Sequence, residues 1–247
     1  MSLLNEKVVV VTGAGSGIGR ACVERFRAEG ATVEAWDRDP AADTGDEGVV
    51  NRAVDVSSAE AVASAAAEAG NRWGGVDVLV NCAGVITPNL PAQDVDPNDY
   101  QRNFDVNLMG IVHTTRELHG MLAERKGAIV NVASQAALVC LPHQSAYSAI
   151  KGAVAALTRS LAIDWAAEGV RVNAVCPGFT RTPMAGGQMS PELEAAVNRR
   201  VPLGRIFEPE EIAASILFFA SDLATAVTGV VMPVDGGWTA GEPALPM

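Results

Sequence analysis

The chain has 247 residues, a hydrophobic fraction of 49% and a formal net charge of -11 at pH 7. This charge argues against nucleic acid or an anionic membrane as the main partner, because both would repel the protein. Since α/β folds of this length are commonly single domains, we expect one domain over residues 1–247.

The first residues, the lengths of the apolar runs and the cysteines indicate the compartment in which the protein works. Residues 1–6 lack a basic region and a long apolar stretch, so we expect no signal peptide. Apolar runs such as residues 8–11 are far shorter than the roughly 18 residues of a membrane span. The four cysteines are widely spaced, which favours reduced thiols over disulfides or a zinc site. We therefore expect a cytoplasmic protein that handles small molecules and holds no metal.

Short β-rich runs alternate with helical stretches, which predicts parallel βα units. The near-continuous apolar strands are typical of a sheet that is buried on both faces, so we expect an α/β, doubly wound sheet of seven parallel strands with helices on both faces. The predicted strands are 7–12, 32–37, 49–55, 76–81, 128–134, 171–176 and 229–234, and the predicted helices are 17–29, 58–72, 97–124, 145–168, 191–200 and 209–220.

A glycine-rich loop, Thr12-Gly-Ala-Gly-Ser-Gly-Ile-Gly19, follows the first strand and opens the first helix. Glycines allow the backbone to turn sharply, to approach a pyrophosphate and to bring the helix close to the sheet. The strand, the helix and a downstream acid all fall where a dinucleotide-binding motif requires them. The expected cofactor contacts in this loop are Gly13, Gly15, Ser16, Gly17, Ile18 and Gly19.

Asp37 ends the second strand, at about the spacing from the glycine loop at which a carboxylate binds the adenosine ribose. A carboxylate at this position repels a 2′-phosphate, so NAD is favoured over NADP. Arg38 is the complication, because a guanidinium beside the ribose is able to bind that phosphate, and Asp37 on its own is also a common turn residue. Ser16 stands where an extra cation would help to hold the phosphate, which again favours NAD.

Tyr147 and Lys151 are four residues apart in the helix predicted over 145–168, so both side chains lie on one face. A phenol with a pKa near ~10 is a poor base at neutral pH, but an adjacent cation favours the phenolate. The spacing alone is weak evidence, since the two residues are common neighbours on helix surfaces.

Several separated motifs together resemble the short-chain dehydrogenase/reductase family, and the resemblance covers nearly the whole chain. These motifs are the Thr12 to Gly19 loop, Asn81-Cys-Ala-Gly84, Asn107, Ser134, Tyr147-x-x-x-Lys151, Pro177-Gly178 with Thr182, and Val234-Asp-Gly-Gly237. The resemblance implies a Rossmann-like fold and a nicotinamide cofactor.

The family pattern implies a catalytic tetrad of Asn107, Ser134, Tyr147 and Lys151. Tyr147 is expected to take the alcohol proton during oxidation and to return it during reduction. Lys151 is expected to hold the phenolate and the nicotinamide ribose, and Ser134 to orient the substrate oxygen. Asn107 is expected to hold a water that links Lys151 to solvent. Singly, each of the four also fits an ordinary cap, core or surface role.

The resemblance also implies the remaining cofactor and substrate contacts. The substrate is expected to contact Ser134, Gln135, Gln144 and Tyr147. An apolar wall is expected from Leu138, Val139 and Leu141. A lid is expected over about 179–200, although this segment also fits an ordinary surface loop. Arg181 in that lid either pairs with an anionic substrate group or forms a surface salt bridge. The other expected cofactor contacts are Asp55, Val56, Asn81, Ala83, Gly84, Pro177, Gly178, Thr180 and Thr182.

These features predict an NAD-dependent oxidoreductase that interconverts a small secondary alcohol, either a polyol or an alicyclic alcohol, and its ketone. Relatives usually form tetramers, so a homotetramer is expected. Two alternatives remain open. One is an NADPH-dependent reductase of thioester-linked 3-oxoacyl chains, and the other is a catalytically silent nucleotide-binding scaffold.

Overall fold

In the computed structural model, which describes residues 2–42, 45–185 and 190–241, seven strands form one parallel sheet. The strand order is β3-β2-β1-β4-β5-β6-β7, so the chain reverses direction across the sheet between β1 and β4. This is the doubly wound sheet that the sequence predicted. The strands are β1 (Val8–Thr12), β2 (Thr32–Asp37), β3 (Val49–Ala53), β4 (Val78–Asn81), β5 (Ala128–Val132), β6 (Arg171–Pro177) and β7 (Val231–Val234).

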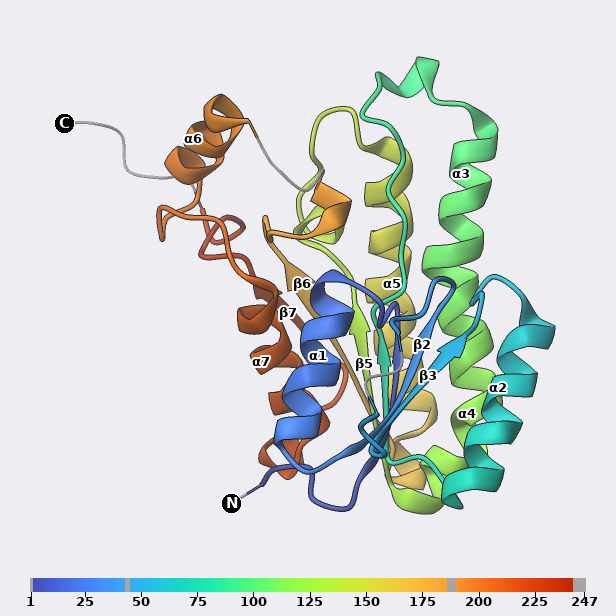
Figure 1. Ribbon diagram of the computed structural model, residues 1–247. Helices are drawn as coiled ribbons and strands as arrows, with labels where there is room; N and C mark the ends of the chain where they lie inside the picture. The colour runs from blue at the N-terminus through green and yellow to red at the C-terminus, as the bar shows by residue number, and fades with distance from the viewer. Residues whose placement is uncertain (1, 43–44, 186–189, 242–247) are drawn as a thin grey trace.

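Helices cover both faces of the sheet, as Figure 1 shows. On one face α1 packs against α7, and on the other α2 packs against α4, with α5 beside them. The helices are α1 (Gly17–Ala28), α2 (Ala59–Trp73), α3 (Pro97–Phe104), α4 (Gly110–Arg125), α5 (Ser145–Asp164), α6 (Pro191–Arg200) and α7 (Pro209–Ala220).

The alternation of side chains along the strands supplies one core to each helical layer. Val9 and Val11 of β1 belong to the cluster that includes Phe26 of α1 and Ile216 of α7. Val10, between them, points to the opposite face and joins the α2 and α4 cluster. Because successive residues of a strand face opposite ways, a fully apolar strand such as β1 is what two covered faces require.

The segment predicted as one helix over 97–124 is not a single α-helix. α3 ends at Phe104, a π-helix spans Asp105–Met109, and α4 begins at Gly110. In a π-helix each hydrogen bond spans one more residue than in an α-helix, which widens the turn, and such turns are frequent at functional sites. Periodicity alone does not reveal a widened turn, because the apolar pattern continues through it.

Parallel strands place their carboxyl ends along one edge of the sheet, where the segments after β1, β2, β4, β5 and β6 gather. Ligands of doubly wound sheets bind at this edge, near the point where the strand order reverses. None of the helices among the described residues is long and apolar enough to cross a membrane.

Candidate active site

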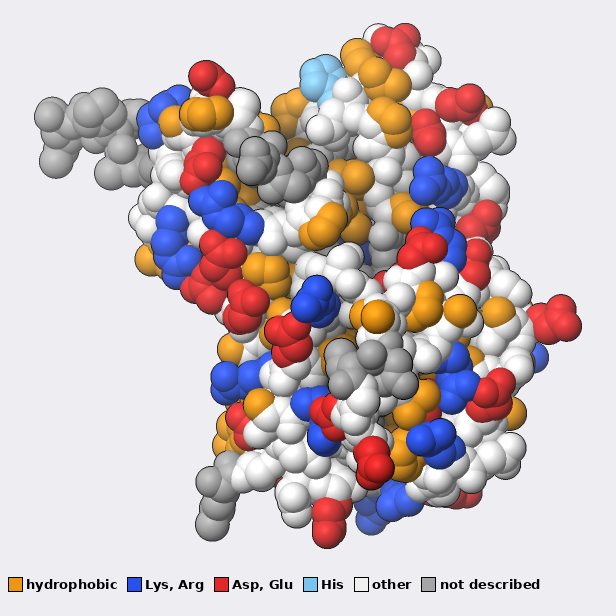
Figure 2. Space-filling model, viewed as in Figure 1, with side chains coloured by type: hydrophobic (Ala, Val, Ile, Leu, Met, Phe, Trp, Pro, Cys, Tyr) orange, Lys and Arg blue, Asp and Glu red, His pale blue; other side chains and the backbone are white. Residues whose placement is uncertain are grey.

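A cavity of about 810 Å³ lies at this edge of the sheet, between the loop after β1 and the start of α5. Figure 2 shows the surface on this side, hollowed between the part over α6 and the part over α3. Both halves of the chain contribute to the wall, since Gly13 and Asp37 come from the first half and Ser134, Tyr147 and Lys151 from the second.

The glycine loop lines one end of this cavity and leaves no room for side chains. Gly13 has a φ of 65°, and a Cβ atom there would lie 2.8 Å from the Ala83 backbone. At Gly19 a Cβ atom would lie 2.1 Å from the carbonyl oxygen of Gly13, so only glycine lets α1 begin this close to the loop. The Ser16 side chain does not cap α1, and the first turn of the helix contains no acid. Its backbone N–H groups therefore remain suited to hold a phosphate.

Asp37 lies beside this loop at the end of β2. Its two carboxylate oxygens accept hydrogen bonds from the backbone N–H groups of Gly15 and Asp39, each at 2.9 Å. Arg38 pairs with the exposed carboxylate of Asp39 at 3.0 Å. Asp37 thus lines the cavity in a fixed orientation, while the guanidinium beside it already has an acidic partner.

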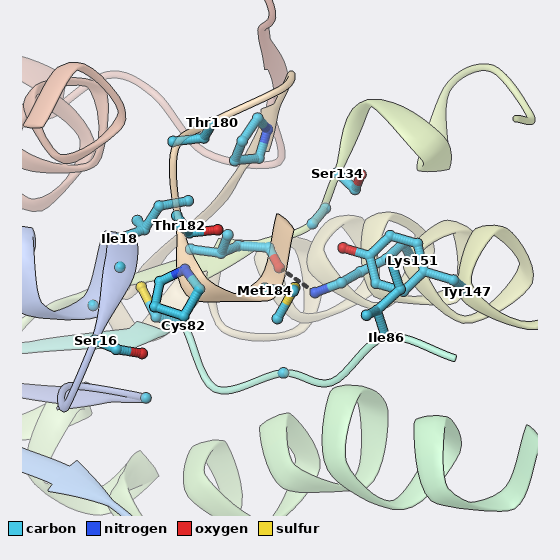
Figure 3. Close-up of a pocket in the computed structure, with 18 of the residues that line it drawn as sticks. Ser16, Ile18, Cys82, Ile86, Ser134, Tyr147, Lys151, Thr180, Thr182 and Met184 are labelled. Atoms are coloured by element: carbon cyan, nitrogen blue, oxygen red, sulfur yellow. Dashed lines mark hydrogen bonds between the residues drawn. The ribbon is translucent and has the colours of Figure 1, made fainter. Parts of the chain in front are cut away.

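Ser134, Tyr147 and Lys151 meet at the other end of the cavity, where Figure 3 shows Tyr147 and Lys151 extending from α5 with Ser134 nearby. Lys151 is 4% exposed and donates a hydrogen bond of 2.8 Å to the carbonyl oxygen of Val132. Its Nζ atom lies 5.8 Å from the centre of the Tyr147 ring. In Figure 3 Tyr147 lies near Ser134, which starts the short helix after β5.

The electrostatics of this pair differ from the prediction of a phenolate favoured by Lys151. Burial raises the pKa of Tyr147, and the nearby Ser134 side chain opposes this only in part. Burial also lowers the pKa of Lys151 to about 8. The reason is that both groups are removed from water, while the ammonium lies over the ring and bonds to Val132.

Asn107 lies in the π-helix and does not line the cavity. Its side-chain nitrogen donates to the carbonyl oxygen of Val85 at 2.8 Å and to Asn103 at 2.7 Å, and its oxygen accepts from the Val85 N–H at 2.7 Å. The amide therefore fastens the segment after β4. A Cβ atom at Gly84, in that segment, would lie 3.1 Å from the Asn107 oxygen and 3.7 Å from the Lys151 nitrogen.

Four of the expected cofactor residues lie outside the lining of the cavity, namely Asp55, Val56, Asn81 and Ala83. Asp55 is exposed, and its carboxylate accepts from the backbone and hydroxyl of Ser57 at 2.9 and 2.6 Å. The Asn81 side chain is buried and bonds to Asn131 at 2.9 Å. The other expected cofactor contacts all line the cavity. They are Gly13, Gly15, Ser16, Gly17, Ile18, Gly19, Asp37, Arg38, Gly84, Tyr147, Lys151, Pro177, Gly178, Thr180 and Thr182.

The substrate wall agrees with the sequence only in part. Gln135, Leu141 and Gln144 line the cavity, whereas Leu138 and Val139 are exposed on the surface. Of the predicted lid, Phe179, Thr180, Thr182, Pro183, Met184 and Leu193 contribute to the wall, and residues 186–189 lie outside the described residues.

Arg181 is held by two carboxylates, with its nitrogens 2.5 Å from Glu194 and 3.2 Å from Glu208. Of the two interpretations of Arg181, this geometry supports the surface salt bridge. It ties the start of α7 and the helix α6 to the segment after β6 that carries Thr180.

Sequence reasoning did not single out Asp39 or Cys82, although both line the cavity. The motif Asn81-Cys-Ala-Gly84 placed Cys82 in the correct segment, but its backbone was expected to matter more than its thiol. Asp39 follows Asp37 by two residues, and its position depends on the turn that Asp37 stabilises.

A model of the family described as enoyl-(acyl carrier protein) reductase matches residues 13–239. The chain belongs to the short-chain dehydrogenase/reductase family. It is 40% identical to a cis-4-hydroxycyclohexanecarboxylate dehydrogenase of Sinomonas cyclohexanicum, over 95% of this chain and 97% of the relative. It is 39% identical to a meso-2,3-butanediol dehydrogenase of Serratia marcescens, over 96% of each chain.

Among solved structures of this family, one of a 3-ketoacyl-(acyl-carrier-protein) reductase from Brucella melitensis, complexed with NADH, superposes with a TM-score of 0.90 at 34% identity. The match covers 96% of this chain and 99% of that one. Short-chain dehydrogenases/reductases bind a nicotinamide cofactor, and this member is an NAD(P)-dependent alcohol dehydrogenase or ketoreductase.

Proposed function

We propose that the protein is an NAD-dependent dehydrogenase that oxidises a small secondary alcohol, a polyol or an alicyclic alcohol, to its ketone. One observation carries this proposal: Ser134, Tyr147 and Lys151 meet in the same cavity as the uncapped start of α1 and the carboxylate of Asp37. A dinucleotide held at one end of that cavity places its reactive ring near the phenol at the other.

In the proposed mechanism, bound NAD supplies the hydride acceptor. Ser134 donates a hydrogen bond to the alcohol oxygen and orients it toward Tyr147, whose phenolate oxygen accepts the hydroxyl proton. The buried ammonium of Lys151 stabilises that phenolate, because opposite charges attract more strongly away from water. In ketone reduction Tyr147 returns the proton.

Asn107 contributes to this mechanism as a positioning residue. Its three hydrogen bonds are made with Val85 and Asn103, so its amide shapes the segment after β4 that passes close to Lys151. The family resemblance also implies a water that links Lys151 to solvent. In this proposal Asn107 acts on that water through the segment after β4 and does not contact the cavity itself.

The preference for NAD rests on Asp37. Its carboxylate lines the cavity beside Gly15, and a 2′-phosphate at this position would meet a fixed negative charge. Arg38 does not offset this charge, since its guanidinium pairs with Asp39. The diphosphate is assigned to the N–H groups at the start of α1, and Asp55 and Val56 to the outer rim of the adenine site.

A second candidate is a reductase of 3-oxoacyl thioesters. The solved reductase from Brucella melitensis favours it, because its fold matches this chain closely and its crystals contain NADH. It requires a surface that attracts an acidic acyl carrier, whereas this chain carries a net charge of -11. The purified protein, assayed with NAD and alcohols and with NADH or NADPH and a 3-oxoacyl thioester, separates the two candidates.

The decisive test of the mechanism replaces Tyr147 by Phe. We expect oxidation with NAD to fall by at least 1,000-fold, since the variant lacks the proton acceptor, while NAD binding measured by calorimetry stays within about threefold. Tyr100→Phe is the matched control, because this phenol bonds to Ser145 outside the cavity. Turnover that survives in the Tyr147 variant would show that another group accepts the proton.

Cytoplasmic location and a homotetramer complete the proposal. Exposed apolar side chains on α5 and after α7, such as Ile163 and Leu223, support association of several copies.

A further inference from the structure

A carboxamide whose oxygen has no partner lines the cavity next to Ser134. Gln135 begins the short helix Gln135–Ala137 and is 4% exposed. Its side-chain oxygen is fully enclosed and has no hydrogen-bond partner among the described residues. A buried acceptor without a hydrogen bond costs on the order of 1–3 kcal/mol. Such a group in a native site therefore calls for a partner from outside the chain.

The Gln135 amide lies between the turn after β6 and the cavity, so a partner reaches it from the cavity. A Cβ atom at Gly178 would lie 3.2 Å from the Gln135 oxygen, so the amide packs against the turn after β6. Gln135 and Gly178 both line the cavity that contains Tyr147. The terminal torsion of glutamine has a broad energy profile, so a rotation of the amide turns its oxygen or its nitrogen toward the cavity.

The substrate end of the cavity offers no free cation among its described lining residues. Lys151 donates to Val132, and Arg38 pairs with Asp39 beside the glycine loop. Arg181, next to the lining, is held by Glu194 and Glu208. An anionic substituent on the substrate would therefore lose its hydration without gaining a counter-charge.

The remaining polar groups at this end are uncharged. Asn89 and Gln144 bond to each other through their amides at 3.2 Å and occupy the more exposed part of the wall. Thr87 is also buried in this wall, but among the described lining residues only Gln135 has an enclosed polar side-chain atom without a partner, so it is the group best suited to recognise a neutral oxygen atom. Gln135 lines the same cavity as Tyr147, so an oxygen that it binds belongs to the same substrate molecule as the carbon that is oxidised.

We propose that Gln135 hydrogen-bonds a second, uncharged oxygen of the substrate, so that the substrate is a neutral diol or polyol and not a mono-alcohol or a hydroxy acid. This inference rests on the proposed alcohol oxidation and specifies the substrate class at the same site. A pocket that hydrogen-bonds a hydroxyl group discriminates against the analogue without it, because its own polar group then stays unpaired.

The test compares butane-2,3-diol with butan-2-ol, which differ by one hydroxyl group, and adds 3-hydroxybutyrate as the anionic substrate. For the wild-type protein we expect kcat/KM to be on the order of 10- to 100-fold higher for the diol than for either alternative. In Gln135→Met, which keeps a similar side-chain volume, we expect the diol value to fall to that of the mono-alcohol, whose own value stays within threefold.

Gln101→Met on the exposed face of α3 is the matched control, and we expect it to retain the diol preference. Calorimetric NAD binding is measured for both variants. Equal loss with both alcohols, or weakened NAD binding in Gln135→Met, would overturn the inference and assign the amide to the cofactor or to folding.

The wild-type comparison decides the matter even where Gln135→Met fails to fold. A wild-type protein that oxidises the mono-alcohol or the hydroxy acid as well as the diol contradicts the role of Gln135 but not the proposed function. Absence of turnover with all three substrates, with NAD still bound, contradicts the proposed function and the inference together.

Discussion

Lys151 illustrates how a single residue serves the site at a cost to the fold. Its ammonium is buried, and desolvation lowers its pKa from 10.5 to about 8. Below pH 8 the amine is charged in the folded and the unfolded protein, so the folded state carries the full cost. Between pH 8 and 10.5 the folded amine is neutral while the unfolded one stays charged, so this cost falls as the pH rises.

We therefore predict that Lys151→Met is inactive but more stable than the wild type at pH 7. The gain in the free energy of unfolding is roughly 3 kcal/mol at most, since each pKa unit corresponds to about 1.4 kcal/mol, and it shrinks by pH 9.5. Calorimetric melting at the two pH values checks this. Exposed Lys126→Met should show no comparable gain. A melting temperature below that of the wild type at pH 7 would contradict the prediction.

The surroundings of Lys151 show which properties of single residues were predictable from the sequence. The spacing of Tyr147 and Lys151 placed both side chains in one cavity, because helical periodicity is a local property. The spacing did not reveal that burial by residues distant in the sequence raises the pKa of Tyr147, and the stabilisation of its phenolate by Lys151 stays a prediction. Gln135 was expected near the substrate, but its lack of a partner is visible only in three dimensions.

At the scale of elements, the π-helix Asp105–Met109 depends on Asn107 for its connection to the sheet. Removal of the amide leaves the N–H and the C=O of Val85 without their partners. We predict that Asn107→Ala lowers the free energy of unfolding by about 2–4 kcal/mol and lowers kcat more than it raises the KM for NAD.

Asn98→Ala, on the exposed first turn of α3, is the control for this substitution. Chemical denaturation and steady-state kinetics measure the two effects. Stability equal to that of the wild type would mean that solvent replaces the Val85 bonds. A loss of stability with unchanged kcat would mean that the segment after β4 does not position Lys151.

The elements themselves were predictable to different degrees. β2, α6 and α7 begin and end at the predicted residues, and a proline after a capping residue marks the start of both helices. The division of the segment 97–124 was missed, and Asn107 in its π-helix bonds to Val85, which is distant in the sequence. Asp55 was assigned from the family pattern; one of its carboxylate oxygens accepts from Ser57, and its contact with the adenine stays a prediction.

At the scale of the molecule, apolar side chains remain on the outside. Ile163 of α5 is 79% exposed, and a neighbouring copy of the chain would bury it. We predict that light scattering detects a particle of four chains and that Ile163→Asp reduces its mass, because an unpaired charge would be buried in the contact. Ala67→Asp, on the exposed face of α2, should leave the mass unchanged. A single-chain mass for the wild type would exclude the tetramer.

The reversal of strand order between β1 and β4 divides the cavity wall between the two halves of the chain. Glycine loop and Asp37 precede the crossover, while Ser134, Gln135 and Tyr147 follow it. Under the proposed function, coenzyme choice and alcohol choice are encoded in separate stretches of the gene. Chimaeras that join the first stretch of one relative to the second stretch of another should inherit one preference from each parent, which makes the crossover a natural point for recombination.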